Sequence, residues 1–366
     1  MDGTWPQNGA RHEPLDFHLT TAGAWEVMTR ACEQARTAID FEQYIVKDDK
    51  AGQGFLSLLA RKAREGVRVR IILDAVGCRS LRQNAVHDAL TAAGAQIVFY
   101  HELRPGRWLR PMTWFPRTHA KLLHVDGVTY LGSMCLADYM RTWRDSMVRL
   151  EDGPARAAQQ DFENLWRDLD DGRLDGTCAA TEVVPVAACY AAQNPKGRHY
   201  PLYDALVAAV DGARREICLA TPYFFPPKRL RRALKAARAR GVRVRLMLSH
   251  ATDVPVADGV TAALLPLWRR CGYEVQLYRD TVLHAKYAVV DDAWATVGSC
   301  NFDYLSLCCN REANIVLHDA AMVAQVRRHF DTDLLHCRPA TADDERAGSW
   351  SRRLKGRIGA VLLHQV

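Results

Sequence analysis

The sequence lacks a membrane-spanning segment, because none of its apolar runs approaches the roughly 18 uninterrupted residues that a bilayer requires. Residues 1–20 contain acidic side chains and no apolar stretch, so they do not resemble a signal peptide. The chain also lacks a Cys-x-x-Cys pair, although it contains 11 cysteines. This spacing does not fit the usual zinc and redox motifs, and we expect buried free thiols in a reducing compartment.

The composition is that of a folded globular protein. Hydrophobic residues make up 48% of the chain and charged residues 25%. A length of 366 residues suggests about two domains. The net charge of +7 suits an anionic partner such as nucleic acid, acidic lipid or a phosphate ester, and charge alone does not choose among these.

The chain contains two similar segments. In each, a strand-like run is followed by a helical stretch that ends at a glycine, and an alternating Val/Arg strand comes directly afterwards. The first copy comprises residues 38–46, 55–64 and 66–71, and the second comprises residues 217–224, 230–240 and 241–246. A further helix and strand precede a strand that carries His-Ala-Lys. This alternation predicts an α/β protein of two similar halves, each a mixed but mostly parallel sheet flanked by helices.

The repeat also sets the expected domain boundaries. These are a first half at 1–170, a connection at 171–198, a second half at 199–340 and a basic amphipathic tail at 341–366. The halves differ mainly in one loop, residues 103–118, which is longer than its counterpart in the second half.

Each half carries one His-x-Lys motif followed by an aspartate. The two sets are His119, Lys121 and Asp126, and His284, Lys286 and Asp291. On a strand, residues two positions apart share a face, so each histidine points the same way as its lysine. Each aspartate follows its histidine at an odd offset, so on an unbroken strand it would face away from the imidazole. We therefore expect the aspartates to shape the next turn or brace the half-site.

A single His-x-Lys motif on a strand is usually ordinary surface polarity. Two copies that share an aspartate at the same offset and a Gly-Ser pair shortly afterwards rarely arise by chance. Lysine is also scarce, since only nine of the 49 Lys and Arg residues are lysine, yet it occupies both motif positions. Because lysine is a compact point charge and arginine a planar fork, this choice suits a tight phosphate site.

Two histidines and two lysines suit phosphodiester cleavage without a metal. One imidazole can attack phosphorus while the other protonates the leaving alkoxide and later activates the incoming hydroxyl. Histidine fits both roles because its pKa lies near working pH. The lysines would hold the non-bridging oxygens together with three polar residues that follow the motifs, Ser133, Ser299 and Asn301.

A carboxylate follows each motif at a matching position. Asp145 begins the run Asp-Ser-Met-Val-Arg-Leu, and Glu312 begins the run Glu-Ala-Asn-Ile-Val-Leu. A carboxylate bonded to one ring nitrogen would fix the histidine tautomer and aim the other nitrogen at phosphorus. We expect this orienting role for both residues, the alternative being ordinary charges at strand ends.

The paired His-x-Lys-x4-Asp pattern resembles that of the phospholipase D superfamily, and within it the likeness is greatest to bacterial cardiolipin synthases. Further segments that carry the likeness are residues 143–151, 220–224, 294–303 and 310–314. The resemblance implies one shared active site, with a phosphohistidine on His119, His284 as the general acid, and no metal or cofactor. It implies transfer of a phosphatidyl group between two phosphatidylglycerol molecules, which forms cardiolipin and releases glycerol. It also implies peripheral attachment to the cytoplasmic side of the bacterial inner membrane.

The first half departs from the family pattern at Cys135. Family members commonly carry asparagine there, and the second half has Asn301 at the matching position. A thiol is a poor hydrogen-bond donor, so the first half should bind phosphate less strongly or use another residue for the contact.

The resemblance, the long loop and the tail together favour an anionic phospholipid at a membrane surface as the partner. The loop combines Trp108 and Trp114 with several arginines, and the tail interleaves apolar and basic residues. Nucleic acid is not expected, although the same loop composition would also suit base stacking. A metal-independent phosphodiesterase or nuclease is therefore the main alternative. A non-catalytic binding protein, suggested by Cys135, is the third hypothesis. For the tail, a merely basic, frayed segment is the other interpretation.

Overall fold

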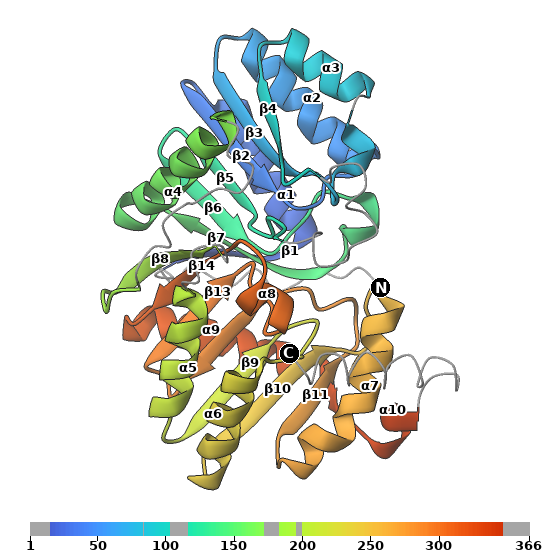
Figure 1. The fold of residues 1–366 in the computed structure, drawn as a ribbon, viewed down its shortest axis with the longest axis vertical. Helices are drawn as coiled ribbons and strands as arrows, with labels where there is room; N and C mark the ends of the chain where they lie inside the picture. Colours follow the sequence, from blue (N-terminus) through green and yellow to red (C-terminus); the bar gives the residue numbers. More distant parts are fainter. Residues whose placement is uncertain (1–14, 83, 103–115, 172–182, 195–199, 347–366) are drawn as a thin grey trace.

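The computed structural model describes residues 15–82, 84–102, 116–171, 183–194 and 200–346 (Figure 1). The elements of the first half are β1 (Asp16–Thr20), α1 (Thr21–Gln34), β2 (Ala38–Gln43), α2 (Lys50–Arg64), β3 (Arg68–Asp74), η1 (Arg79–Leu81), α3 (Ala85–Ala92), β4 (Gln96–Tyr100), β5 (Leu122–Val125), β6 (Val128–Gly132), η3 (Asp138–Met140), β7 (Arg144–Leu150) and α4 (Asp152–Asp170).

The elements that follow are β8 (Ala188–Gln193), α5 (Pro201–Gly212), β9 (Glu216–Ala220), α6 (Lys228–Ala239), β10 (Arg243–Ser249), α7 (Pro255–Arg270), β11 (Glu274–Tyr278), β12 (Tyr287–Val290), β13 (Trp294–Gly298), α8 (Tyr304–Cys308), β14 (Glu312–Leu317), α9 (Ala320–Leu334), β15 (Cys337–Pro339) and α10 (Ala342–Arg346).

The strands form two mixed sheets, one in each half, as the repeat predicts. The seven-stranded sheet has the order β1-β7-β6-β5-β2-β3-β4, and the eight-stranded sheet has the order β15-β11-β10-β9-β12-β13-β14-β8. Parallel pairing is confined to β2-β3-β4 and β9-β10-β11, whereas the other neighbouring strands are antiparallel. The expectation of mostly parallel sheets is therefore wrong. The strand after each His-x-Lys motif turns back within a few residues, and so short a connection allows only antiparallel neighbours.

The aspartate of each motif forms that turn. Asp126 and Asp291 have φ angles of 47° and 51°, in the left-handed region that aspartate tolerates better than most residues. The Asp126 carboxylate accepts hydrogen bonds from the backbone N–H groups of residues 36–38, at 2.7–3.0 Å. Asp291 likewise accepts from the N–H groups of residues 214–216, at 2.5–2.8 Å. Both aspartates thus fasten the turn to the start of the neighbouring strand, in agreement with the offset of the sequence motif.

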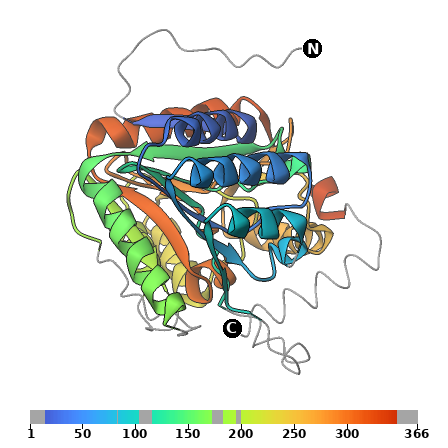
Figure 2. The same ribbon diagram turned by 90° about the horizontal axis from the view of Figure 1, so that it is seen from above.

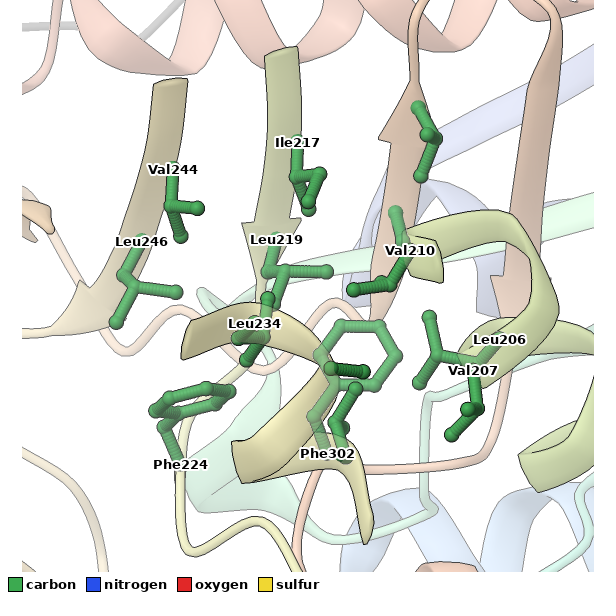
Figure 3. Packing of buried hydrophobic residues seen from close by; sticks show 14 of the residues in the cluster. Leu206, Val207, Val210, Ile217, Leu219, Phe224, Leu234, Val244, Leu246 and Phe302 are labelled. Carbon is green, nitrogen blue, oxygen red and sulfur yellow. The ribbon is translucent and has the colours of Figure 1, made fainter. Parts of the chain in front are cut away.

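One face of each sheet is covered by three helices. In the second half, apolar side chains of α5, α6, β9 and β10 interdigitate between helices and sheet (Figure 3). They include Leu206, Val207 and Val210 of α5, Leu234 of α6, Ile217 and Leu219 of β9, and Val244 and Leu246 of β10. Full burial of such a side chain stabilises the fold by roughly 1.5–3 kcal/mol. In the first half, α1, α2 and α3 contribute to a second core of this kind.

The other faces of the two sheets pack against each other and form a seam (Figures 1 and 2). Leu131 and Val148 of the first sheet share one buried cluster with Val297 and Ile315 of the second. Helix α4 packs against β6 and β8, and α9 packs against β12 and β13. Because α4 follows the first sheet and contacts a strand of the second, the halves share a core.

The expected connection, residues 171–198, contains a strand of the second sheet. Residues 188–193 were assigned to the connection, but they form β8, which pairs with β14 at the edge of the second sheet. Helix α4 is the described element before this strand, and the sequence analysis had placed the strand in the connection that follows that helix. Residues 103–115 of the long loop and 347–366 of the tail lie outside the described residues. Among the described helices, none has both the length and the apolar character needed to cross a bilayer.

Candidate active site

The segment that carries each histidine is docked on the opposite half. The backbone N–H of His119 donates to the carbonyl of Arg311, just before β14, at 2.8 Å. The N–H of His284 donates to the carbonyl of Arg144, at the start of β7, also at 2.8 Å. Both motifs therefore meet at the seam, and neither half positions its own histidine alone.

The two expected orienting carboxylates pair with the histidines across the seam. Nδ1 of His119 lies 2.9 and 3.0 Å from the two carboxylate oxygens of Glu312, which belongs to the second half. Nδ1 of His284 lies 3.1 and 3.3 Å from those of Asp145, which belongs to the first half. A carboxylate that accepts from Nδ1–H leaves Nε2 as the nitrogen able to attack or transfer a proton.

Both imidazoles line a single cavity of about 570 Å³. The first half contributes Tyr44, Ile45, Cys135 and Met140, and the second contributes Tyr223, Phe225, Asn301, Asp303, Ser306, Asn310 and the start of α7. The histidines are 8% and 9% exposed, so each shows only an edge to the cavity. Among the described residues, no cluster of three or more His, Cys, Asp or Glu side chains is arranged to hold a metal ion.

The two serines that were expected to bind phosphate hold the carboxylates instead. The hydroxyl of Ser133 donates to Asp145, and that of Ser299 donates to Glu312 at 2.5 Å. Both serines are fully buried and stand behind the histidines rather than in the cavity. Asn301 does line the cavity, and its buried Oδ1 has no partner among the described residues.

Both motif lysines are fully buried. The ammonium group of Lys121 donates to the carbonyl of His119 at 2.6 Å, and that of Lys286 donates to the carbonyl of His284. Burial lowers the pKa of both lysines, in the case of Lys286 to about 7. Each lysine thus places an ammonium group behind its histidine, and burial makes that group lose its proton more easily than an exposed lysine does.

Aromatic rings fix the histidines from their other side. Tyr44 packs edge-on against His119 at 4.9 Å between ring centroids, and Trp143 packs against His284 at 5.2 Å. The ammonium of Lys121 lies 5.2 Å from the centre of the Tyr44 ring. The sequence analysis did not assign a role to either aromatic residue, because they follow no repeat: the halves use different positions for this contact.

Two buried arginines, one before each orienting carboxylate, tie the half-sites together. Arg144 pairs with Asp333 of α9 at 2.7 Å. Arg311 pairs with Glu42 of β2 at 2.8 Å and with Asp161 of α4 at 2.6 Å. Each ion pair crosses the seam, so removing one partner would leave an uncompensated buried charge. The repeated Arg-acid dipeptide was the sequence signal for these residues, and it was not used.

Electrostatics distinguish the two histidines. Burial, followed by the charges of Lys121 and Lys286, holds the pKa of His119 well below its ordinary value. Burial and Lys286 also lower the pKa of His284, but there Asp145 opposes the shift. At neutral pH, His119 is therefore a neutral imidazole, whereas His284 has a partner that favours its protonated form.

The two orienting carboxylates, Glu312 and Asp145, also differ in pKa. Burial raises the pKa of Glu312 to about 7, against the opposing charge of Lys121. Burial of Asp145 also opposes its ionisation, but the charge and hydrogen bond of His284 hold its pKa below the usual range. Asp145 is therefore the more readily ionised of the two carboxylates, and Glu312 keeps a proton more readily. Asp126 and Asp291 take no part in this network, because they lie at the far ends of β5 and β12.

The sequence and the fold were compared with known proteins. The family described as "Cardiolipin synthase, PLD-like domain" matches residues 28–166 and 206–334. Cardiolipin synthase B of Escherichia coli strain K12 is 32% identical over 350 residues, which cover 90% of this chain and 77% of that protein. A probable cardiolipin synthase of Bacillus subtilis is 29% identical over 317 residues, and the match spans 83% of this chain and 63% of that relative's length.

Among solved structures, the phosphatidylserine synthase of Haemophilus influenzae superposes with a TM-score of 0.77 at 15% identity, covering 97% of this chain and 95% of that one. At this identity the likeness supports the fold alone, and the two matched segments of the family cover both His-x-Lys motifs. The chain therefore belongs to the phospholipase D superfamily, within the family defined by the cardiolipin synthase PLD-like domain.

Proposed function

We propose that this protein is a phosphatidyltransferase that makes cardiolipin from two molecules of phosphatidylglycerol and releases glycerol. The single observation that carries the proposal is the convergence of His119 and His284, each with its own carboxylate, on one cavity. The relatives named as cardiolipin synthases support the choice of lipid. We further propose that the protein works at the membrane surface, on the cytoplasmic side, without a metal or cofactor.

In the first step, Nε2 of His119 attacks phosphorus, and the bond from phosphorus to the glycerol head-group oxygen breaks. His284 gives its proton to that oxygen, so that neutral glycerol leaves and a phosphohistidine remains. The neutral state of His119, with Nδ1–H bonded to Glu312, supplies the lone pair for attack. The ionised Asp145 stabilises the imidazolium form of His284 before it acts as the acid.

In the second step, a hydroxyl of the second phosphatidylglycerol attacks phosphorus, and the bond to His119 breaks. His284, now neutral, takes the hydroxyl proton and returns to its starting state. Lys121 and Lys286, buried behind their histidines, favour negative charge on the phosphate through space, and the amide of Asn301 offers a hydrogen bond from the cavity wall. Cleavage and resynthesis thus use the same residues in opposite order.

The character of the cavity favours lipid over nucleic acid. Apolar side chains, among them Ile45, Met140 and Val260, line it close to the histidines. At its edge, Val254 and Val256 of the α7 end are 41% and 59% exposed. Apolar surface beside a phosphate site lowers the cost of partly withdrawing an acylated substrate from a bilayer, and a polyanionic strand gains nothing from it.

The experiment is incubation of the full chain with phosphatidylglycerol vesicles in the presence of a chelator, followed by mass spectrometry of lipids and water-soluble products. We expect cardiolipin and free glycerol in equal amounts. Phosphatidic acid in place of cardiolipin would point to a hydrolase. Nicking of plasmid DNA in chelator with no lipid turnover would favour the alternative, a metal-independent nuclease. Binding of lipid without turnover of any diester would indicate a non-catalytic protein.

A further inference from the structure

The two halves supply equivalent segments to the walls of the catalytic cavity. Strands β2 and β9 pair with β5 and β12 in the same register, so Ile45 in the first half stands where Tyr223 stands in the second. The segments that follow β6 and β13 also correspond. Counted from the last residue of each strand, Cys135 matches Asn301.

The residues of the two halves also correspond one to one through the short helices η3 and α8 that follow. Ala137 and Asp303 are the residues that cap the starts of η3 and α8, and Met140 and Ser306 follow each cap by the same number of positions. Both Met140 and Ser306 line the cavity.

At every one of these four positions, the first half is apolar and the second half is polar. We call Ile45, Cys135 and Met140 the apolar wall, and Tyr223, Asn301, Asp303 and Ser306 the polar wall. The contrast applies to these matched positions, since Tyr44 of the first half and Phe225 and Leu305 of the second also line the cavity. Helix α7 adds apolar residues as well, from the exposed Val254 and Val256 at the rim to the buried Val260 further in.

The polar wall carries groups able to bond hydroxyls. The phenol of Tyr223 donates to the exposed carboxylate of Asp253 at 3.0 Å, and Thr252 is its second hydrogen-bond partner, so the hydroxyl group is fixed at the cavity wall. Asp303 accepts from the backbone N–H of Ser306 at 2.8 Å and is 7% exposed. The amide of Asn301 is also 7% exposed, and its oxygen has no partner among the described residues. An unpaired buried amide is costly unless a bound molecule completes its hydrogen bonds.

We propose that the polar wall is the binding site for the polyol head group, first that of the leaving glycerol and then the hydroxyls of the acceptor, while the apolar wall faces the acylated glycerol of the donor. This assignment rests on the proposed transferase function and adds the residues that set its selectivity. A polyol placed against the apolar wall would lose its hydrogen bonds to water without replacement, so only one orientation of the substrate is favoured.

The test is a competition between two alcohols as acceptors. Phosphatidylglycerol vesicles are incubated with equal concentrations of deuterated glycerol and 1-propanol, and the ratio of labelled phosphatidylglycerol to phosphatidylpropanol is measured. Tyr223→Ile with Asn301→Cys gives the polar wall the side chains of the apolar wall at two positions. We expect the ratio to fall about tenfold, as for loss of one hydrogen bond to the alcohol.

Two further variants keep the test decisive. Tyr223→Phe removes only the hydroxyl, and it should lower the ratio in the same direction if the double variant fails to fold. Ile45→Val, a matched change on the apolar wall, should keep the wild-type ratio whatever its total rate. An unchanged ratio in the Tyr223 variants with lipid turnover intact would overturn the assignment alone. Failure of the unmodified protein to turn over any phospholipid would overturn the transferase function and this assignment with it.

Discussion

His119 and His284 are held by the same backbone arrangement, but their partners make them chemically different. His119 faces Glu312, whose pKa is raised to about 7, whereas His284 faces Asp145, whose pKa is lowered. Burial acts on both carboxylates, so the difference comes from the charges and hydrogen bonds around them. A duplicated fold can therefore place two identical side chains in one site and give them different electrostatic surroundings, as the proposed roles of nucleophile and acid require.

The largest effect should come from removing the histidines. His119→Ala takes away the atom that bonds phosphorus, and we expect cardiolipin formation to fall below detection. His284→Ala removes proton transfer, which is worth roughly 10²–10⁴-fold in rate. Product formation from phosphatidylglycerol vesicles, with circular dichroism as a control for folding, measures both. Near-normal activity in either variant would disprove a shared site.

The next largest effect concerns the orienting carboxylates. Asp145→Asn removes the charge that stabilises the His284 imidazolium, and we expect a rate loss of roughly 10²-fold or more. Glu312→Gln keeps an oxygen able to accept from Nδ1–H of His119, and burial already disfavours the charge of the glutamate by raising its pKa to about 7. We therefore expect a smaller loss, about tenfold. Equal losses in the two variants would mean that the half-sites do not differ as described.

A dependence on pH should follow from Lys286. Burial lowers its pKa to about 7, so its positive charge is present below that pH and is lost above it. We expect kcat/KM for phosphatidylglycerol to decline above about pH 7. Arginine keeps its charge at any working pH, so Lys286→Arg should lose this alkaline decline even if its overall rate is lower. A decline that persists unchanged in the variant would assign it to another group.

The smallest effect should be found where the halves are alike. Asp126→Asn and Asp291→Asn each weaken the hydrogen bonds that fasten a turn to the next strand. Asparagine tolerates the positive φ, so the loss reflects the carboxylate charge. We expect a decrease of about 1–2 kcal/mol in the free energy of unfolding for each variant. Chemical denaturation would measure it, and a large difference between the two would show that the turns are not equivalent.

The sequence predicted the two halves, the strands that follow the motifs and the turn-forming aspartates, because those features are local and repeated. It placed the motifs themselves on strands, whereas β5 and β12 begin directly after Lys121 and Lys286. It did not predict the crossed pairing of Glu312 with His119 and Asp145 with His284. That pairing depends on how the sheets meet at the seam, which no spacing within one half reveals. The serine hydroxyls were misassigned for the same reason, since their carboxylate acceptors become neighbours only after the halves pack.

The sequence also did not predict that most neighbouring strands in each sheet are antiparallel. Periodicity identifies a strand but not the direction of its neighbour, and only the short turn at Asp126 hinted at it. The contrast between the cavity walls is a further case, because Ile45 and Tyr223 match only when the strand registers are known.

The most direct test of the central claim uses a phosphatidyl ester of p-nitrophenol, whose leaving group needs no proton. With this substrate, His284→Ala should release one p-nitrophenolate per chain in a burst and then stop. Transfer of the phosphatidyl group from His119 to an acceptor hydroxyl would be slow, because the variant lacks the base that takes the hydroxyl proton. Mass spectrometry of the digested protein should find the phosphatidyl adduct on His119. The absence of a burst in His284→Ala, or a burst with an adduct on His284 in His119→Ala, would contradict the account.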